Sequence, residues 1–387
     1  ARYQYVHGTP DYVGKDLQRY LDVTAEDVMR VYNKYIKDQH AVILSVYPKG
    51  QPPMTAKPDN FVYERDKSLK ANMAQYEGLS YKKPTKDEDG FDRSVKPASG
   101  PSPVIKVPEY WTAKMNNGIK IIGAKNSEIP KVNLRFGIKA GHRYEDPAKA
   151  GISQLFASMM AGTTENYTTE EFAGELEKLG SSISVSSSTD EVVINVSSLT
   201  KNLDGTLKLL EEAMMRPKFT DEDFQRLKFS QMESIANQVN DPKVLADNQF
   251  KKVLYGDGHI LAIPAVGTEE TMGSVTLEDV QAFYKSHFAP NITNLVIVGD
   301  VAKDEVMGKL AYLENWEQRE VPVRKQPETP AKSATKIYLV DKPEAAQSEI
   351  RMGYLALPYE ATGEYYKSKL MNVNLGGNFN SRIHHDL

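Results

Sequence analysis

The sequence has 387 residues, 40% of them apolar and 26% charged, which is typical of a folded protein of two or more domains. The formal net charge of −4 gives no electrostatic reason to expect nucleic acid as a partner. There are no cysteines, so disulfides, thiolate zinc sites and a cysteine nucleophile are excluded together. No apolar run approaches the roughly 18 residues that a membrane-spanning helix needs, so no membrane span is predicted.

A short internal repeat indicates how the chain is organised. The residues VTAEDV at 23–28 recur as VTLEDV at 275–280, and an aliphatic run follows each copy, at 41–50 and at 294–302. In both copies a Thr with an Asp three residues later is typical of a helix N-terminus. The β-branched run after it is typical of a buried strand. The sequence therefore predicts that one module ends at 1–50 and that another ends near residue 302.

The segment 51–107 is predicted to connect modules. It is rich in proline and contains the charge cluster KKPTKDEDG and the stretch PASGPSP. This composition favours extended chain with little packing. Several aromatic residues in it suggest that the connector lies against a domain surface.

A complete module is predicted at 108–330. Asn117-Gly118 favours a hairpin turn, and the alternation in VNLRFGIKAG predicts a half-buried strand. Two further strands are expected in SSISVSSS and EVVINVSS, the first as an edge strand with a polar face. Helices are predicted over 148–161, 168–180, 201–216, 220–239 and 243–255. A further module opens at 335–387 with KIYLVD, IRMGYLALP and a helix over 362–375.

Several segments carry a likeness to known proteins, among them NGIKIIGAKN, VNLRFGIKAGHRYEDPAKAGISQLFASMMAGTT, KNLDGTLKLLEEAMMRPKFTDEDF and NDPKVLADNQFKKVLYGDGHILAIPAVGTEE. Together with the order of the elements, they resemble the pitrilysin/insulinase family of zinc metallopeptidases, which includes the mitochondrial processing peptidase. The resemblance implies an α+β fold of repeated lobes, each an antiparallel sheet packed with helices. Two lobes make a half, and two halves enclose a chamber.

The resemblance also implies a domain assignment. Residues 1–50 would end the second lobe of a first half, and 51–107 would connect the halves. Residues 108–330 would form a complete third lobe, and 335–387 would begin a truncated fourth lobe. Because both ends of the chain look like domain interiors, we expect it to be a piece of a larger protein.

The catalytic signature of this family is an inverted zinc motif, His-x-x-Glu-His, with a Glu further along the chain. The resemblance places the motif on 154–158, so that Gln154 and Ser158 stand at the histidine positions and Ala157 at the general base. The distal Glu position falls at Ser234, with Glu233 beside it. Gln and Ser oxygens are weak zinc ligands, and Ala157 cannot transfer a proton. We therefore expect neither catalysis nor a metal in this chain, and zinc in a missing N-terminal half.

Two other groups of residues are weaker candidates. None of the seven histidines pairs with another ligand at metal spacing on one element. Gly376, Gly377 and Arg382 resemble a turn near the substrate strands of the family's second lobe, which makes them substrate-chamber candidates. The alternative, which we favour, is a helix C-cap after Leu375.

The predicted function is that of a non-catalytic half of an insulinase-like zinc metallopeptidase, which helps to enclose a polypeptide substrate. Its partners would be the N-terminal catalytic half of the same polypeptide and the substrate itself. The alternative is a non-enzymatic scaffold or peptide-binding protein with a peptidase-like fold. Similarity to bacterial two-half members implies a periplasmic or cell-envelope location. An upstream His-x-x-Glu-His would favour the peptidase over the scaffold.

Overall fold

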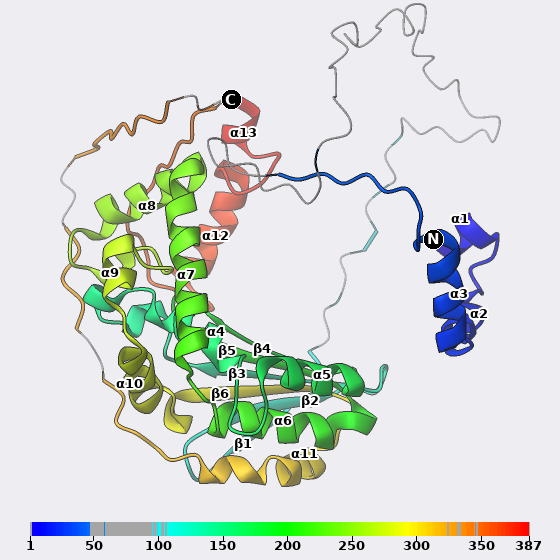
Figure 1. The fold of residues 1–387 in the computed structure, drawn as a ribbon. Coiled ribbons are helices and arrows are strands. Elements are labelled where there is room, and N and C mark those ends of the chain that lie inside the picture. Colours follow the sequence, from blue (N-terminus) through cyan, green and yellow to red (C-terminus); the bar gives the residue numbers. More distant parts are fainter. Residues whose placement is uncertain are drawn as a thin grey trace, which may run out of the picture. The chain divides into compact units, whose positions relative to one another are not determined.

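The protein divides into two compact units, Ala1–Ser102 and Pro103–Leu387 (Figure 1). No helix in the described part of the chain is long and apolar enough to cross a membrane. The computed structural model describes residues 2–46, 107–322, 325–330, 334–343 and 347–386, with a few single residues between these ranges. The predicted connector lies almost entirely outside these residues.

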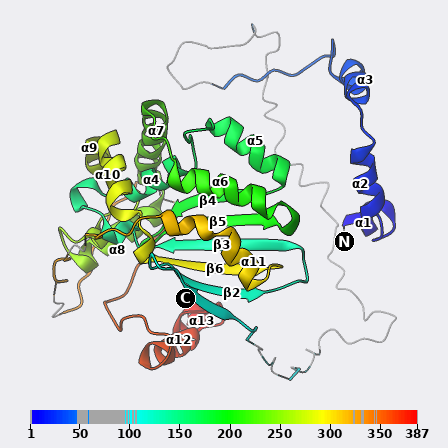
Figure 2. The same ribbon diagram turned by 90° about the horizontal axis from the view of Figure 1, so that it is seen from below.

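Within the described residues, the second unit contains a six-stranded sheet with the order β1-β2-β6-β3-β5-β4. Figure 2 shows β5, β3, β6 and β2 side by side. The strands are β1 (Trp111–Lys114), β2 (Lys120–Lys125), β3 (Lys131–Ile138), β4 (Ser182–Ser187), β5 (Val192–Leu199) and β6 (Thr293–Gly299).

The sheet is mixed, which corrects the expectation of an antiparallel one. β6 pairs in parallel with β2, with Lys120 opposite Asn294, and every other neighbouring pair is antiparallel. The reason is the return of the chain after the helices. β6 enters between β2 and β3, which run in opposite directions, so a strand antiparallel to β3 must run along β2.

Helices pack on one face of this sheet, and the predicted helices are all present. The helix expected at 148–161 begins only at Ile152, because Gly151 has a φ of 99° and separates it from a short 3-10 turn at Pro147–Lys149. The helices of the lobe are α4 (Ile152–Met160), α5 (Thr169–Leu179), α6 (Leu203–Met215), α7 (Asp221–Asn237), α8 (Pro242–Tyr255), α9 (Glu269–Ser274), α10 (Leu277–His287) and α11 (Lys303–Lys309).

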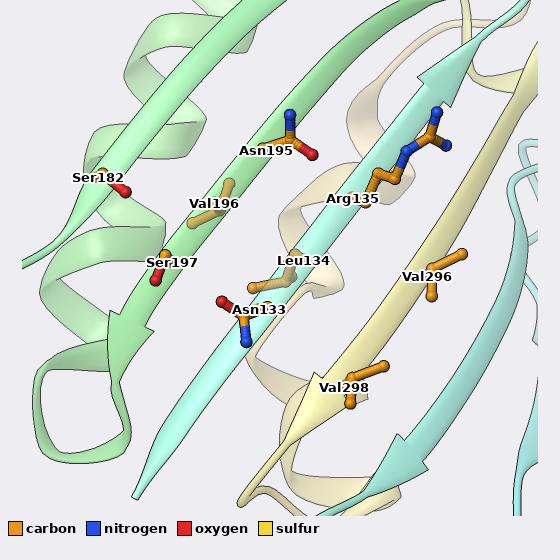
Figure 3. A pocket seen from close by; sticks show the side chains of 9 residues that line it. All are labelled: Asn133, Leu134, Arg135, Ser182, Asn195, Val196, Ser197, Val296 and Val298. Carbon is orange, nitrogen blue, oxygen red and sulfur yellow. The ribbon is translucent and has the colours of Figure 1, made fainter. Parts of the chain in front are cut away.

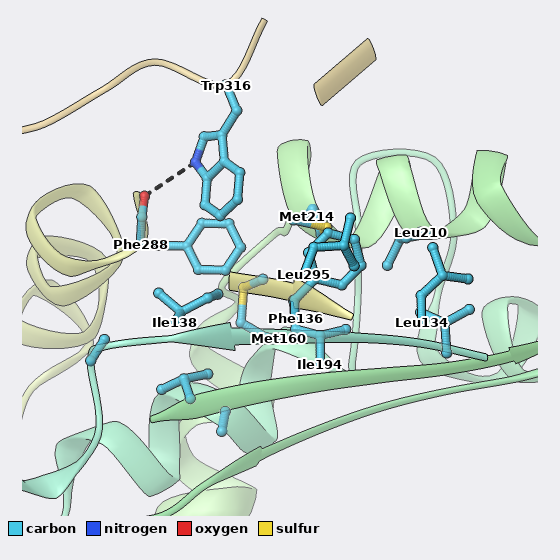
Figure 4. Packing of buried hydrophobic residues seen from close by; sticks show 14 of the residues in the cluster. Leu134, Phe136, Ile138, Met160, Ile194, Leu210, Met214, Phe288, Leu295 and Trp316 are labelled. Carbon is cyan, nitrogen blue, oxygen red and sulfur yellow. Dashed lines mark hydrogen bonds between the residues drawn. The ribbon is translucent and has the colours of Figure 1, made fainter. Parts of the chain in front are cut away.

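The core lies between the sheet and these helices (Figure 4). The alternation in β3 buries Leu134, Phe136 and Ile138 completely, as the sequence predicted. Burying each such side chain stabilises the fold by roughly 2 kcal/mol. Above them, the indole Nε1 of Trp316 donates a hydrogen bond of 3.2 Å to the Phe288 carbonyl, so the ring is fixed where its polar atom is satisfied.

Strand β4 forms one edge of the sheet, as predicted from its serines. Ser182, Ser184 and Ser186 are exposed, while Ile183 and Val185 turn toward the helices and pack on the core. A polar outer face of this kind keeps an edge strand soluble.

The aliphatic run at 41–50 that the sequence predicted as a strand is not one over its described residues, and two further aliphatic segments are irregular as well. Residues 41–46, 336–341 and 349–357 are irregular, and Val42 and Leu339 are 100% and 93% exposed. A strand is stable only when a neighbouring strand accepts and donates its backbone hydrogen bonds. The described residues supply no such neighbour to these segments. Helices α12 (Glu364–Leu375) and α13 (Arg382–Asp386) follow them.

The first unit contains α1 (Arg2–His7), α2 (Val13–Leu21) and α3 (Ala25–Tyr35), in which no residue is buried. The predicted cap of α3 is present, because Thr24 and Asp27 exchange backbone-to-side-chain hydrogen bonds of 3.2 and 3.3 Å. Thr276 and Asp279 form the same box at the start of α10. The two copies of the repeat therefore begin their helices with the same capping box.

Candidate functional site

Helix α4 carries the positions that the resemblance assigned to the zinc motif. Gln154 and Ser158 are exposed one turn apart on the same face, and Ala157 is buried. The Ser158 hydroxyl donates a hydrogen bond of 3.0 Å to the Gln154 carbonyl, so it is already used within the helix. This face therefore offers an amide and an engaged hydroxyl, and it holds no ionisable group at the three motif positions.

Ser234 and Glu233 lie exposed on α7, the helix that packs against α4. One turn earlier, the buried Gln231 amide donates to the carbonyls of Gly151 at 3.0 Å and of Val266 at 2.8 Å. This amide attaches α7 to the start of α4. The structure thus places the four motif positions on two packed helices, with the three polar ones at the surface.

A buried His–Glu pair lies beneath the start of α4. His142 Nδ1 is 2.7 Å from Glu145 Oε2, and the Glu145 carboxylate accepts hydrogen bonds from the backbone N–H groups of Gly151 and Ser153, at 2.9 and 2.8 Å. The carboxylate therefore caps the positive end of the α4 dipole. The other ring nitrogen, Nε2, lies 2.9 Å from the carbonyl of Ile260 and 3.0 Å from that of Ile263.

Both nitrogens of the His142 ring thus face acceptors, an arrangement that an imidazolium satisfies and a neutral ring does not. Burial alone would lower the pKa of His142, but the hydrogen bond and charge of Glu145, with the two carbonyls, raise it above the ordinary value. The pair joins α4 to the loop at 260–263. This pair was not predicted from the sequence, although the His-x-x-Glu spacing just before a predicted helix was a usable signal.

Helix α4 also contacts the edge strand β4. The buried Ser153 hydroxyl and the Ser187 hydroxyl at the end of β4 are 2.8 Å apart. The edge of the sheet therefore lies against the same helix whose outer face carries Gln154 and Ser158.

The opposite face of the sheet is open and contains a shallow groove (Figure 3). Arg135 in the groove pairs with Glu191 at 2.8 Å. Polar side chains of β3, β4 and β5 line one side of the groove (Asn133, Ser182, Asn195 and Ser197), and Val296 and Val298 of β6 line the other (Figure 3).

The substrate-chamber candidates lie on a different element. Gly376 is the C-cap of α12, and its N–H donates to the Asn372 carbonyl at 3.0 Å. The C-cap interpretation is confirmed for Gly376. Gly377 donates to the same carbonyl at 2.7 Å, and Arg382 begins α13.

The described residues contain no group of three or more His, Cys, Asp or Glu side chains arranged to hold a metal ion. Three is the relevant number because zinc sites in proteins use three or four protein ligands.

Comparisons with known proteins agree on one family. The model described as "Insulinase (Peptidase family M16)" matches residues 120–258, and the model "Peptidase M16 inactive domain" matches residues 274–387. The chain belongs to the insulinase family of peptidases, M16.

Its relatives carry different names. The "Non-peptidase homolog YmxG" of Helicobacter pylori is 25% identical over 272 residues, which cover 68% of this chain and 61% of the relative. The "Uncharacterized zinc protease YmxG" of Bacillus subtilis is 22% identical over 272 residues, 70% of this chain and 65% of the relative. The chain therefore spans less than two thirds of the length of these relatives.

The fold is also found in solved structures. The peptidase M16 inactive domain from Pseudomonas fluorescens matches with a TM-score of 0.53 and 22% identity, over 57% of this chain and 54% of that chain. The periplasmic protease PqqL from Escherichia coli matches with a TM-score of 0.51 and 19% identity, over 58% of this chain and 26% of that chain.

Proposed function

We propose that this chain is the non-catalytic part of an M16 zinc peptidase and forms one wall of the chamber that encloses a polypeptide substrate. The outer face of α4 is the observation that carries the proposal. It presents Gln154 and Ser158 where the family's zinc motif requires histidines, and a buried methyl group at Ala157 where it requires a base. The fold that positions a zinc site is present, and the ligands are replaced.

The catalytic zinc would be bound in a second half of the same polypeptide, upstream of this chain. In this arrangement residues 108–330 are the third lobe, 1–50 end the second lobe, 51–107 join the halves and 335–387 begin the fourth. The match to only 26% of PqqL, a much longer protein, supports a chain that is one part of a multi-lobe enzyme. PqqL is described as periplasmic, which supports a periplasmic location for this chain.

A non-enzymatic scaffold is the second candidate function, favoured by the name of the H. pylori relative, which is called a non-peptidase homolog. The two candidates differ in the upstream polypeptide. A His-x-x-Glu-His motif with a distal Glu there supports the peptidase, and its absence supports the scaffold.

The loss of the zinc site is tested by metal analysis of the purified chain and of a variant in which the histidines are restored, Gln154→His with Ser158→His. We expect less than stoichiometric zinc in the wild type and a gain of zinc affinity in the variant, because two imidazoles one turn apart on a helix face can share one metal. The matched control is Gln154→His with Ser153→His, whose second position is buried on another face of α4. Stoichiometric zinc in the wild-type chain would contradict the proposal.

A further inference from the structure

A second pocket, of about 290 Å³, lies where the end of α6 and helix α10 meet a 3-10 helix at Ala311–Asn315 and the residues after it. It shares no residue with the groove on the open face of the sheet or with the zinc-motif positions on α4. The side chains that matter most in its lining are Met215, Tyr284, Tyr312, Trp316 and Arg319.

Two aromatic side chains give this pocket an apolar wall. The Tyr284 hydroxyl donates a hydrogen bond of 3.0 Å to the Met214 carbonyl, and the Trp316 indole Nε1 donates to the Phe288 carbonyl (Figure 4). Because both polar atoms are engaged within the fold, the two rings offer hydrocarbon to the pocket, as Met215 does. The wall therefore suits the apolar part of a ligand.

Tyr312 brings a hydroxyl without a partner to the same pocket. Its oxygen is buried and has no hydrogen-bond partner within the described part of the chain. Burial, and after it the charge of Glu211, raises the pKa of Tyr312, so the hydroxyl keeps its proton. A buried hydroxyl that makes no hydrogen bond destabilises a fold, and it is a donor available to a ligand.

Arg319 brings a cation without an acidic partner among the described residues. Its guanidinium carbon lies 5.7 Å from the centre of the Tyr284 ring, and Nη1 donates to the carbonyls of Tyr284, at 3.0 Å, and Lys285. The Asn291 side chain fixes its backbone with hydrogen bonds of 2.9 and 3.1 Å. Nε and Nη2 have no partner among the described residues. These two nitrogens form an edge of the guanidinium that can bind a carboxylate with two parallel hydrogen bonds.

The other charged groups of the pocket do not compensate Arg319. Arg216 is neutralised by Glu212 at 2.6 Å and by Glu211 at 3.2 Å. Glu317 is exposed and forms no ion pair with any described residue. Solvent screens its charge, so its repulsion of an anion bound at Arg319 is weak.

We propose that this pocket binds a carboxylate carried on an apolar body. Arg319 pairs with the carboxylate, and the Tyr312 hydroxyl donates to it. The rings of Tyr284 and Trp316 cover the apolar part. A free aliphatic acid and the C-terminus of a peptide that ends in an apolar residue both have this chemistry. The pocket contains none of the motif positions on α4, so the proposal does not depend on the loss of zinc ligands.

The first test compares two probes of nearly equal shape, N-acetyl-leucine and its neutral amide, by NMR titration of the full purified chain. We expect saturable binding of the acid and binding of the amide at least about tenfold weaker, because the amide loses the charge-assisted hydrogen bonds. Isocaproate, which lacks the acetamido group, separates the two sources of the ligand. Equal binding of isocaproate and N-acetyl-leucine would identify free acids, and weaker binding of isocaproate would identify peptide C-termini. Equal binding of acid and amide, or no saturable binding of either acid, would overturn the proposal.

The second test removes the Tyr312 hydroxyl alone, with Tyr312→Phe. Because this hydroxyl has no partner in the described fold, we expect the midpoint of thermal unfolding to stay the same or to rise. Binding of the acid should weaken by about tenfold, since a hydrogen bond to a charged group is lost. The control is Tyr366→Phe, at an exposed position on α12, which should change neither quantity. A destabilised Tyr312→Phe, or one that binds the acid as the wild type does, would overturn the proposal.

The third test determines the sign of the charge that the pocket prefers. Arg319→Lys keeps the positive charge and loses the two-nitrogen edge, and we expect it to bind the acid about tenfold more weakly. Glu317→Gln removes a repulsive charge and should strengthen binding by about twofold. Glu222→Gln, at an exposed position on α7, is the control and should leave binding unchanged. Weaker acid binding by Glu317→Gln would assign a cation to the pocket and overturn the proposal.

Discussion

The imidazole of His142 and the carboxylate of Glu145 form a buried pair, with Nδ1 2.7 Å from Oε2 and side-chain exposures of 3% and 0%. Through Glu145 the pair holds the first turn of α4, and through Nε2 of His142 it holds the loop at 260–263. The helix that carries Gln154 and Ser158 is therefore held at its first turn by hydrogen bonds to this pair.

This pair predicts a pH dependence of stability. The folded-state pKa of His142 is raised, so its contribution is complete below the ordinary value of about 6.5 and is lost as pH rises through the raised value. We expect the free energy of unfolding of wild type to fall, relative to that of His142→Asn, as the pH rises through this range. Urea unfolding of both proteins at several pH values measures the difference. Burial lowers the pKa values of His259 and His287, so these two residues make stability rise with pH, opposite to His142. Comparing wild type with His142→Asn cancels their contribution, because both proteins contain them. A difference that does not change with pH would contradict the charged state of His142.

Removing the carboxylate should cost much more than removing one at the surface. Glu145→Gln leaves a buried imidazolium without its counter-charge, and we expect a loss of about 3 kcal/mol. The matched control is Asp190→Asn, which breaks the 2.5 Å pair with Arg143, whose two side chains are 60% and 42% exposed. We expect the control to change stability by less than about 1 kcal/mol. Urea unfolding of both variants at one pH measures the contrast, and equal losses would refute a special role for Glu145.

Gly151, the residue before α4, should not tolerate a side chain. Its φ is 99°, and a Cβ there would lie 2.6 Å from the Val266 carbonyl oxygen. We expect Gly151→Ala to destabilise the protein by at least about 1–2 kcal/mol. Gly174 within α5 has no atom near a new Cβ, so Gly174→Ala should stabilise by about 0.5–1 kcal/mol. Opposite shifts of the thermal midpoint are expected, and a neutral Gly151→Ala would contradict the strained start of α4.

The Gln231 amide should matter for the contact between α7 and α4. Gln231→Leu leaves the Val266 carbonyl without a donor, while the Gly151 carbonyl keeps the Leu155 N–H, and an unsatisfied buried acceptor costs about 1–3 kcal/mol. We expect faster amide exchange at the start of α4 and a lower free energy of unfolding. Gln225→Leu on the exposed side of the same helix is the control and should change neither quantity. Unchanged exchange in Gln231→Leu would show that the amide does not hold α4.

Local sequence determined much of this protein. The Thr–Asp boxes at 24–27 and 276–279 set helix starts, because the groups that bond are three residues apart. The alternation of apolar and polar residues in 131–138 determined which face of β3 is buried. The i, i+4 spacing placed Gln154 and Ser158 on one face of α4.

Tertiary structure decided the rest. β6 runs parallel to β2 because it enters the sheet beside a strand far away in the sequence. His142 joins the start of α4 to the loop at 260–263 because the fold brought the carbonyls of that loop to its ring. The aliphatic run at 41–46 also shows that strand formation depends on tertiary structure. It has the composition of β6 and is not a strand, because backbone hydrogen bonds between strands need a partner that local sequence cannot supply.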